Sequence, residues 1–319
     1  MRQARSPFVR LALTTLLGLW LSLAGAPEAV ARALRVVTSS TDLMAIAKEI
    51  GKDRVRAHSF FLGYQEPEIW VDEVFPSWML KTARADDYIR IGLFADIWAD
   101  IVIEGARNPK IFPGSPLLVD ASKGVEVLEV PTGRVDRAMG EIHVQGNPHY
   151  LLDPLNGKIV AANILRGLIE ASPDDADFFR KNAEDFSRRI DHAMARWEVA
   201  ARPLRGKKLA AYHKTFSYLA RRFGFEVVGY CEPRPGIEPS PTDVRRLVET
   251  MTREGARVII HAPVYSPRIP RAVAREVEKR TDQPVRVIML PAHVGGVPEA
   301  KDYFSFFDYL LAKLNEAVR

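Results

Sequence analysis

The stretch S-P-D-D-A-D-F-F-R-K-N-A-E-D-F-S-R-R-I-D-H-A-M-A-R-W, residues Ser172 to Trp197, predicts a long helix in the middle of the chain. Ser172 suits an N-cap, Pro173 suits the first helical position, and the two aspartates that follow favour a helix N-terminus. Apolar residues then recur at helical spacing, namely Phe178, Phe179, Ala183, Phe186, Ile190, Met194 and Trp197. The pattern extends nearly to Pro203, and roughly 29 residues at 1.5 Å each span about 43 Å. A helix of this length indicates a stiff connection between two halves of the protein.

Short β-branched segments alternate with amphipathic segments on both sides of this helix. The expected strands are Leu34–Thr38, Val55–Leu62, Asp87–Ile91, Lys208–Tyr212, Glu226–Tyr230, Arg257–Ile260 and Val285–Leu290. The expected helices include Thr41–Ile50, Pro76–Ala83, Thr242–Arg253 and Ile269–Arg280. Because such alternation favours parallel sheets covered by helices, we predict an α/β protein of two lobes. Each lobe is a mainly parallel sheet flanked by helices, and a long rigid helix joins them; the alternative is one large single domain with the helix lying across it.

The first 33 residues have the layout of a secretory signal peptide. Arginines precede a mainly apolar run from Leu11 to Ala24, and Ala31-Arg32-Ala33 then supplies a small-residue cleavage site. The run is short for a membrane span, and no cysteine lies near the cleavage site to carry a lipid. We therefore expect an exported, soluble chain that is not a lipoprotein, with an uncleaved anchor as the alternative. The expected divisions are a signal peptide 1–33, an N-terminal lobe 34–172, a connecting helix 173–203 and a C-terminal lobe 204–319.

The composition excludes some classes of protein. The chain of 319 residues has a formal net charge of +5, but four arginines and one glutamate in the first 33 residues account for most of it. A mature chain at about +2 gives no argument for nucleic-acid binding. Hydrophobic residues make up 47% of the sequence, which is enough for a core in each of two lobes. Cys231 is the only cysteine, so an intramolecular disulfide is excluded.

Several side chains that can bind a metal lie near predicted strand ends or in a stiff loop. In open parallel sheets, ligands bind in the crevice beyond the carboxyl ends of the strands. This argument selects His213, His261 and His293, each after a predicted strand, and the segment Gln65–Glu68 after Val55–Leu62, while His149 lies in a loop before the helix that opens near Asn156. Imidazoles with a carboxylate suit zinc, and they are also compatible with manganese or iron. Spacing alone leaves plain loop or core histidines as an open alternative, because no compact ligand motif is present.

Five segments resemble, in order, the motifs of one family. They are Val36–Ser40 with Leu43, Pro76–Leu80 followed by Ala85-Asp86 and Ile91–Leu93, Gly146–Pro154, Tyr212–Phe216 followed by Phe223–Phe225, and Glu232–Pro241. The third resembles a P-H-x-W-L-D-P motif, and the last an E-P-x-P-G-x-x-P-S-P motif. Over essentially its whole mature length, the chain resembles the metal-specific solute-binding proteins of bacterial ABC importers for zinc and manganese. The resemblance implies two α/β lobes, a rigid connecting helix, and a metal bound between the lobes by ligands from both.

The same resemblance implies a set of ligands, in which two positions depart from the family pattern. His149 and His213 match two of the family's histidine ligands. Glu68 stands where the family usually has a histidine in a D-P-H sequence, and His293 lies in the loop that usually supplies an aspartate. The implied site is Glu68, His149, His213 and His293, with its carboxylate moved from the second lobe to the first. The alternatives are a weak site that has lost its first ligand, or a site whose acidic ligand is Asp302.

Two further histidines are expected to have lesser roles. The His-rich loop of many zinc-binding members is absent here, and Gly140–His143 is what remains of it. His143 is therefore expected to be a plain loop residue, with transient contact with incoming metal as the alternative. His261 stands at a strand end where Ala262 replaces the family's acidic residue, so His261 is expected to be structural or supporting.

The function implied by the resemblance is capture of a divalent metal in the periplasm, zinc before manganese, and its delivery to a cognate ABC permease in the inner membrane. The protein would then be a monomeric binding protein and not an enzyme, with the metal as its cargo and no nucleic-acid partner. One alternative is an exported metal-dependent hydrolase, for which Glu66 or Glu68 supplies a general base. Another is a binding protein that has diverged to a different solute.

Overall fold

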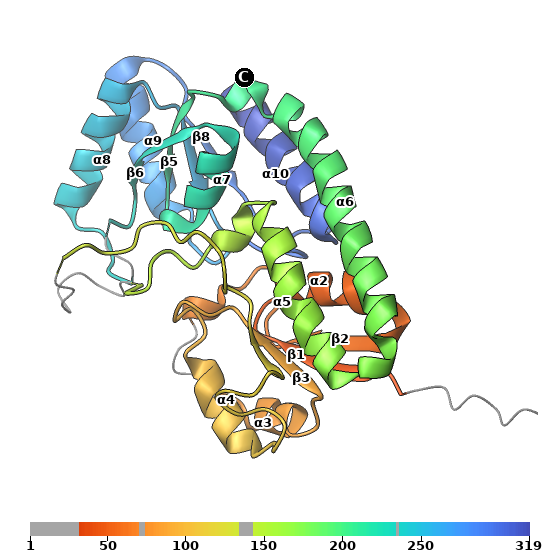
Figure 1. The fold of residues 1–319 in the computed structure, drawn as a ribbon. Helices are drawn as coiled ribbons and strands as arrows, with labels where there is room; N and C mark the ends of the chain where they lie inside the picture. Colours follow the sequence, from red (N-terminus) through yellow and green to blue (C-terminus); the bar gives the residue numbers. More distant parts are fainter. Residues whose placement is uncertain (1–31, 70–73, 134–142, 234–235) are drawn as a thin grey trace, which may run out of the picture. The chain divides into compact units, whose positions relative to one another are not determined.

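The computed structural model describes residues 32–69, 74–133, 143–233 and 236–319 (Figure 1). The predicted signal peptide therefore lies almost wholly outside the described residues, as do residues 140–142 of the loop that precedes His143. Leu34–Arg319 form a unit of their own, and this unit contains all the elements described below.

Two four-stranded sheets form the framework of this unit, and every strand pair in them is parallel. The first sheet has the order β2-β1-β3-β4, with strands at Leu34–Thr38 (β1), Val55–Ser59 (β2), Asp87–Arg90 (β3) and Leu118–Asp120 (β4). The second has the order β6-β5-β7-β8, with strands at Lys208–Ala211 (β5), Glu226–Tyr230 (β6), Val258–His261 (β7) and Arg286–Met289 (β8). The predicted fold class is thereby confirmed. Every predicted strand is present, although several end earlier than predicted.

Helices connect these parallel strands, as crossover connections require. The helices are Thr41–Gly51 (α2), Pro76–Thr82 (α3), Trp98–Ala106 (α4), Asn156–Ala171 (α5), Ala176–Ala200 (α6), Ser217–Phe223 (α7), Pro241–Glu254 (α8), Arg268–Thr281 (α9) and Tyr303–Val318 (α10). Short 3₁₀ turns lie at Lys52–Arg54 (η2), Pro67–Ile69 (η3), Tyr150–Leu152 (η5), Pro173–Asp175 (η6), Arg202–Leu204 (η7) and Lys214–Phe216 (η8). Within the described ranges, none of the helices is both long enough and apolar enough to cross a membrane.

The long central helix is confirmed, with a different start. Residues Pro173–Asp175 form the 3₁₀ turn η6, and the α-helix α6 begins at Ala176. The Ser172 hydroxyl donates to Asp175 Oδ2 at 2.8 Å, so Ser172 does not cap the α-helix as predicted. Ser172 instead occupies the N-cap position of η6, without a side-chain capping bond, and Asp175 is the N-cap of α6.

Helix α6 contacts elements of both halves of the fold (Figure 1). Near its start, Asn182 Nδ2 donates to the Ile50 carbonyl of α2 at 2.9 Å. Near its end, Trp197 Nε1 donates to Asp308 Oδ1 of α10 at 2.7 Å. The buried face of α6 is the apolar series predicted from the sequence, except that Phe178 is half-buried. The helix therefore serves as a spine along which both sheets are assembled.

One hydrophobic cluster includes residues from both sheets and from the spine. It contains Val36 of β1, Phe186 of α6, Ile260 of β7 and Leu310 of α10, among others. A core shared in this way favours a stiff arrangement over two lobes that move freely. The predicted boundaries at residues 172 and 203 stay a prediction.

Asp87 on β3 is a fully buried carboxyl group, and neither of its oxygens has a well-aligned hydrogen-bond partner among the described residues. Burial raises the pKa of Asp87 well above its ordinary value; the backbone N–H of Tyr88 opposes this effect, and the charge of Asp86 adds to it. A raised pKa in the folded state means that the stability linked to this group is present at low pH and is lost as the pH rises through the raised value.

We therefore expect the pH dependence of unfolding to change in an Asp87→Asn variant. Between about pH 5 and about pH 8 the wild-type protein should lose stability from Asp87, and the variant should not. Urea unfolding of both proteins across this range measures the difference in free energy of unfolding, which should shift in favour of the variant as the pH rises. A constant difference over the range would contradict the expectation.

Candidate metal centre

Glu68 lies in the 3₁₀ turn η3, which follows β2. This turn is fixed from outside, because the indole Nε1 of the buried Trp98 donates to the Pro67 carbonyl at 3.1 Å. Within the turn, the N–H of Ile69 donates to the Glu66 carbonyl at 3.2 Å. The carboxylate of Glu68 is thus presented by a short, anchored turn of the first half of the fold.

His149 is presented by a loop that leads into η5. The N–H of His149 donates to Asn147 Oδ1 at 2.9 Å, and Pro148 between them restricts the backbone. His149 is 7% exposed, so its position in a loop does not make it a surface residue. A buried imidazole on a stiff loop is suited to holding a ligand at small entropic cost.

His213 directly follows Tyr212 at the carboxyl end of β5, as predicted. Its Nδ1 lies 2.8 Å from Glu232 Oε2, in the segment that follows β6. Because a carboxylate accepts, Nδ1 carries the proton and Nε2 is left with its lone pair. A carboxylate behind a histidine in this way fixes the tautomer and the ring orientation that a metal ligand needs.

The structure brings Glu68, His149 and His213 together, with one potential ligand atom from each within 4.8 Å of the others. Glu68 Oε1 lies 3.2 Å from His149 Nε2 and 3.8 Å from His213 Nε2. Although these atoms are close, neither Nε2 has a hydrogen-bond partner of good geometry among the described residues. Buried polar atoms normally have such partners, and a cation between a carboxylate and two imidazoles would satisfy all three groups.

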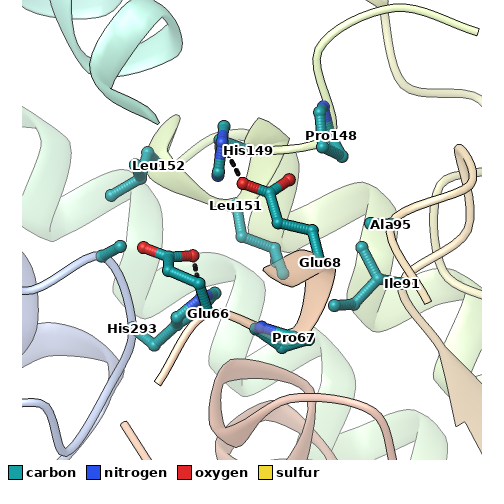
Figure 2. Close-up of a pocket in the computed structure, with 11 residues that line it drawn as sticks. Glu66, Pro67, Glu68, Ile91, Ala95, Pro148, His149, Leu151, Leu152 and His293 are labelled. Atoms are coloured by element: carbon teal, nitrogen blue, oxygen red, sulfur yellow. Dashed lines mark hydrogen bonds and ion pairs between the residues drawn. The ribbon is translucent and has the colours of Figure 1, made fainter. Parts of the chain in front are cut away.

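The electrostatics of Glu68 agree with this arrangement. Burial alone would raise the pKa of Glu68, but His149 and His143 hold the pKa of the carboxyl well below its usual range. Figure 2 shows the Glu68 carboxylate directed at His149 in a small pocket, whose other walls include Ile91 and Leu151. The pocket has a volume of ≈ 20 Å³ and is lined by Glu68, His149 and His293, whereas His213 and His143 are not among its lining residues.

His143, which the sequence predicted to be a plain loop residue, contacts this cluster. Its Nε2 lies 3.1 Å from Glu68 Oε2, and its ring is centred 6.4 Å from the ring of His149. The only signal in the sequence was the position of His143 in the remnant of the family's His-rich loop, which gave transient contact with incoming metal as the alternative. His143 therefore faces the second carboxylate oxygen of Glu68, which is not the oxygen nearest His149.

His293, predicted as the fourth ligand, lines the same pocket but is held by two carboxylates. Its Nδ1 contacts Asp42 Oδ2. Figure 2 shows its other contact, in which Nε2 lies 3.0 Å from Glu66 Oε2. Burial alone would lower the pKa of His293, but Asp42 and Glu66 raise it well above the ordinary imidazole value. The N–H of Val294 also donates to Asp42 Oδ1 at 2.8 Å. In this arrangement both ring nitrogens of His293 are engaged, so coordination of a metal would require it to release a carboxylate.

The two alternative residues have structural positions. Asp302 is the N-cap of α10 and accepts from Phe304 N at 3.0 Å and Ser305 N at 2.9 Å. His261 is buried, with Nδ1 3.0 Å from the carbonyl of Ala262. Neither belongs to the cluster of Glu68, His149 and His213.

Similar proteins are known with the same fold and with sequences that align over most of the chain. The high-affinity zinc uptake system protein ZnuA of Bacillus subtilis (strain 168) is 21% identical over 261 residues, covering 81% of this chain and 80% of that protein. The manganese ABC transporter substrate-binding lipoprotein PsaA of Streptococcus anginosus is 23% identical over 292 residues, covering 89% of each. A crystal structure of ZnuA superposes with a TM-score of 0.74 at 22% identity, covering 90% of this chain and 100% of that one. Residues 36–317 match the family described as zinc-uptake complex component A, periplasmic, and the chain belongs to this family.

Proposed function

We propose that this protein captures one divalent transition metal ion at Glu68, His149 and His213 and delivers it to an ABC importer, with zinc favoured over manganese as the cargo. The observation that carries the proposal is the convergence of one carboxylate and two imidazoles within 4.8 Å. Two nitrogen ligands favour zinc over manganese, because manganese prefers a larger share of oxygen ligands. The names of the relatives cover both metals, since one is a zinc uptake protein and another a manganese transporter component.

The fourth position has two candidates. His143 contacts the cluster through Glu68, because its Nε2 lies 3.1 Å from Glu68 Oε2, although His143 is not among the residues whose ligand atoms lie within 4.8 Å of one another. His293, the residue expected from the sequence, would first have to leave Glu66 or Asp42. We propose a zinc site of Glu68, His143, His149 and His213, and the variants His143→Ala and His293→Ala decide between the two histidines.

The transport role follows from the family and from the position of the ligands. Glu68 comes from the first half of the fold and His213 from the second, so both halves must hold the ion and handover must weaken at least one of these contacts. A permease in the inner membrane is the proposed partner, and a monomer exported by a cleavable signal peptide, without a lipid anchor, is the proposed form. Hydrolysis is less well supported, because a metal-activated reaction needs a free general base and Glu66 is already paired with His293.

Metal titration of the purified protein tests the proposal. After removal of bound metal with a chelator, the protein is titrated with zinc and with manganese, each in competition with a chromophoric chelator. We expect one ion per chain for both metals and tighter binding of zinc. The absence of stoichiometric binding for both metals would contradict the proposed function, and tighter binding of manganese would contradict the preference for zinc.

A further inference from the structure

A buried tyrosine connects the segments that carry the two histidine ligands. Tyr218 lies on α7, five positions after His213, and its side chain is fully buried. Its hydroxyl donates to the carbonyl of Asn147 at 2.9 Å, two positions before His149. The same hydroxyl accepts from the N–H of Leu128 at 2.9 Å. One hydroxyl thus bonds to two backbone groups of the segments around the His149 loop.

The side chain of Asn147 makes a second connection between the same segments. Its Oδ1 accepts from the N–H of His149 at 2.9 Å, and its Nδ2 donates to the carbonyl of Lys214 at 2.9 Å. Lys214 is the next residue after His213. Asn147 is 4% exposed, so these bonds are shielded from competing water. Asn147 therefore joins the backbone of His149 to the backbone beside His213.

An ion pair one helical turn after Tyr218 makes a further contact between α7 and the segment that carries His149. Arg222, at the end of α7, donates to both oxygens of Asp153 at 2.7 and 2.6 Å. Asp153 is 1% exposed, and a bidentate pair with one buried partner has a well-defined geometry. The ion pair adds a third contact between the segment that follows His213 and the segment that carries His149.

We propose that Tyr218 and Asn147 are positioning residues that hold His149 and His213 at a fixed separation in the metal-free protein. The inference rests on the proposed function in one respect, namely that both histidines bind the metal. Neither residue offers an atom to the ion, and their bonds run through the backbone, so this connection forms whether or not an ion is bound. The two rings, centred 5.7 Å apart at 78°, are thereby arranged before the ion arrives.

Preorganisation of this kind reduces the ordering that binding would otherwise require. Its loss should act mainly on the rate of metal release, because a loosened His149 leaves the ion more often while the path of entry is unchanged. Partners of metal ligands typically change affinity by about 10- to 100-fold when they are removed. We expect Tyr218→Phe and Asn147→Asp to fall in this range. The second variant keeps the acceptor for His149 N and removes the donor to Lys214 O and to Glu129 Oε2, the latter 3.3 Å from Asn147 Nδ2.

The experiment compares these two variants with Tyr88→Phe as a matched control. Tyr88 is also fully buried, and its hydroxyl lies 3.3 Å from Ser39 Oγ in the first sheet, where it contacts neither histidine segment. Three measurements are made on each protein: zinc affinity, the rate of zinc release to an excess of chelator, and amide hydrogen exchange of the metal-free form. In Tyr218→Phe and Asn147→Asp we expect release to be at least about 10-fold faster and the amide of His149 to exchange faster, with zinc stoichiometry unchanged. Tyr88→Phe should match the wild type in release rate and in exchange at His149.

The outcomes separate this proposal from the proposed function. A wild-type protein that binds no zinc would overturn both. Wild-type binding together with wild-type release rates in the two variants would overturn only the positioning role. Faster exchange throughout the chain, with the same change in Tyr88→Phe, would assign Tyr218 a general stabilising role and would also overturn the proposal. If Tyr218→Phe does not fold, Asn147→Asp carries the same test.

Discussion

Replacement of His213 by alanine is expected to lower the affinity for zinc by more than about 100-fold. Removal of a residue that only hydrogen-bonds to a metal ligand typically lowers the affinity by about 10- to 100-fold, and loss of the ligand itself should lower it further. The substitution has a second effect, since Glu232, which is 9% exposed in the wild-type protein, accepts from His213 Nδ1 and would lose this partner. Competition titration with a chromophoric chelator measures the affinity, and metal analysis of the purified protein gives the stoichiometry. His149→Ala should behave similarly, because its Nε2 also faces Glu68.

Two further variants make this result specific. His192→Ala changes an exposed histidine on α6 and should bind zinc like the wild type. Glu232→Gln keeps a hydrogen-bonding group of the same shape behind His213 but removes the negative charge, so its loss of affinity should lie between those of the control and His213→Ala. Full-strength, stoichiometric zinc binding by both His149→Ala and His213→Ala would eliminate the proposed site.

The position of ligands at the ends of parallel strands was the part of the site that sequence could predict. A parallel sheet puts the carboxyl ends of all its strands at one edge, so a residue directly after a strand has a defined place in space. This argument selected His213 and the segment Gln65–Glu68, but it also selected His261 and His293, which lie outside the cluster. The family resemblance was needed to single out Glu68 and His149. The structure places potential ligand atoms of Glu68, His149 and His213 within 4.8 Å of one another.

The partners of these side chains could not be predicted in the same way. Asp42, which contacts His293, is separated from it by 251 positions and stands in the first turn of α2, where an acidic residue already has a local explanation. Loop histidines such as His143 have no periodic pattern from which a direction could be inferred. Pairing of buried charges is decided by tertiary packing, which no single segment encodes.

The elements of the fold, like the residues of the site, could be predicted from the sequence only in part. Strands long enough to contain a β-branched run were predicted, and the three-residue edge strand at Leu118–Asp120 was missed because so short a segment has no pattern. The central helix was predicted from its apolar series, but the 3₁₀ geometry of Pro173–Asp175 at its start was not. Periodicity predicts the body of an element better than it predicts its ends.

The second prediction with a large effect concerns His293. His293→Ala is expected to lower the free energy of unfolding of the metal-free protein by about 3–5 kcal/mol, which is the usual result of removing one partner from a buried ion pair. The reason is that Asp42 and Glu66 would remain as buried carboxylates, with side chains each 3% exposed, without the imidazolium between them. Urea unfolding measures this loss, and zinc titration of the folded variant should still give one ion per chain with near wild-type affinity.

His143→Ala is the matched comparison, because it removes the other candidate for the fourth ligand. The His143 side chain is 20% exposed and contacts Glu68, so its loss should cost little stability but should weaken zinc binding by at least about 10-fold. The double variant His293→Ala, Asp42→Asn is the control for the effect of charge at this position. It removes one of the two buried carboxylates that His293→Ala leaves without the imidazolium, so it should recover part of the lost stability. If His293→Ala instead lost zinc binding while His143→Ala retained it, His293 would be the fourth ligand, and its release from Glu66 would have to accompany metal capture.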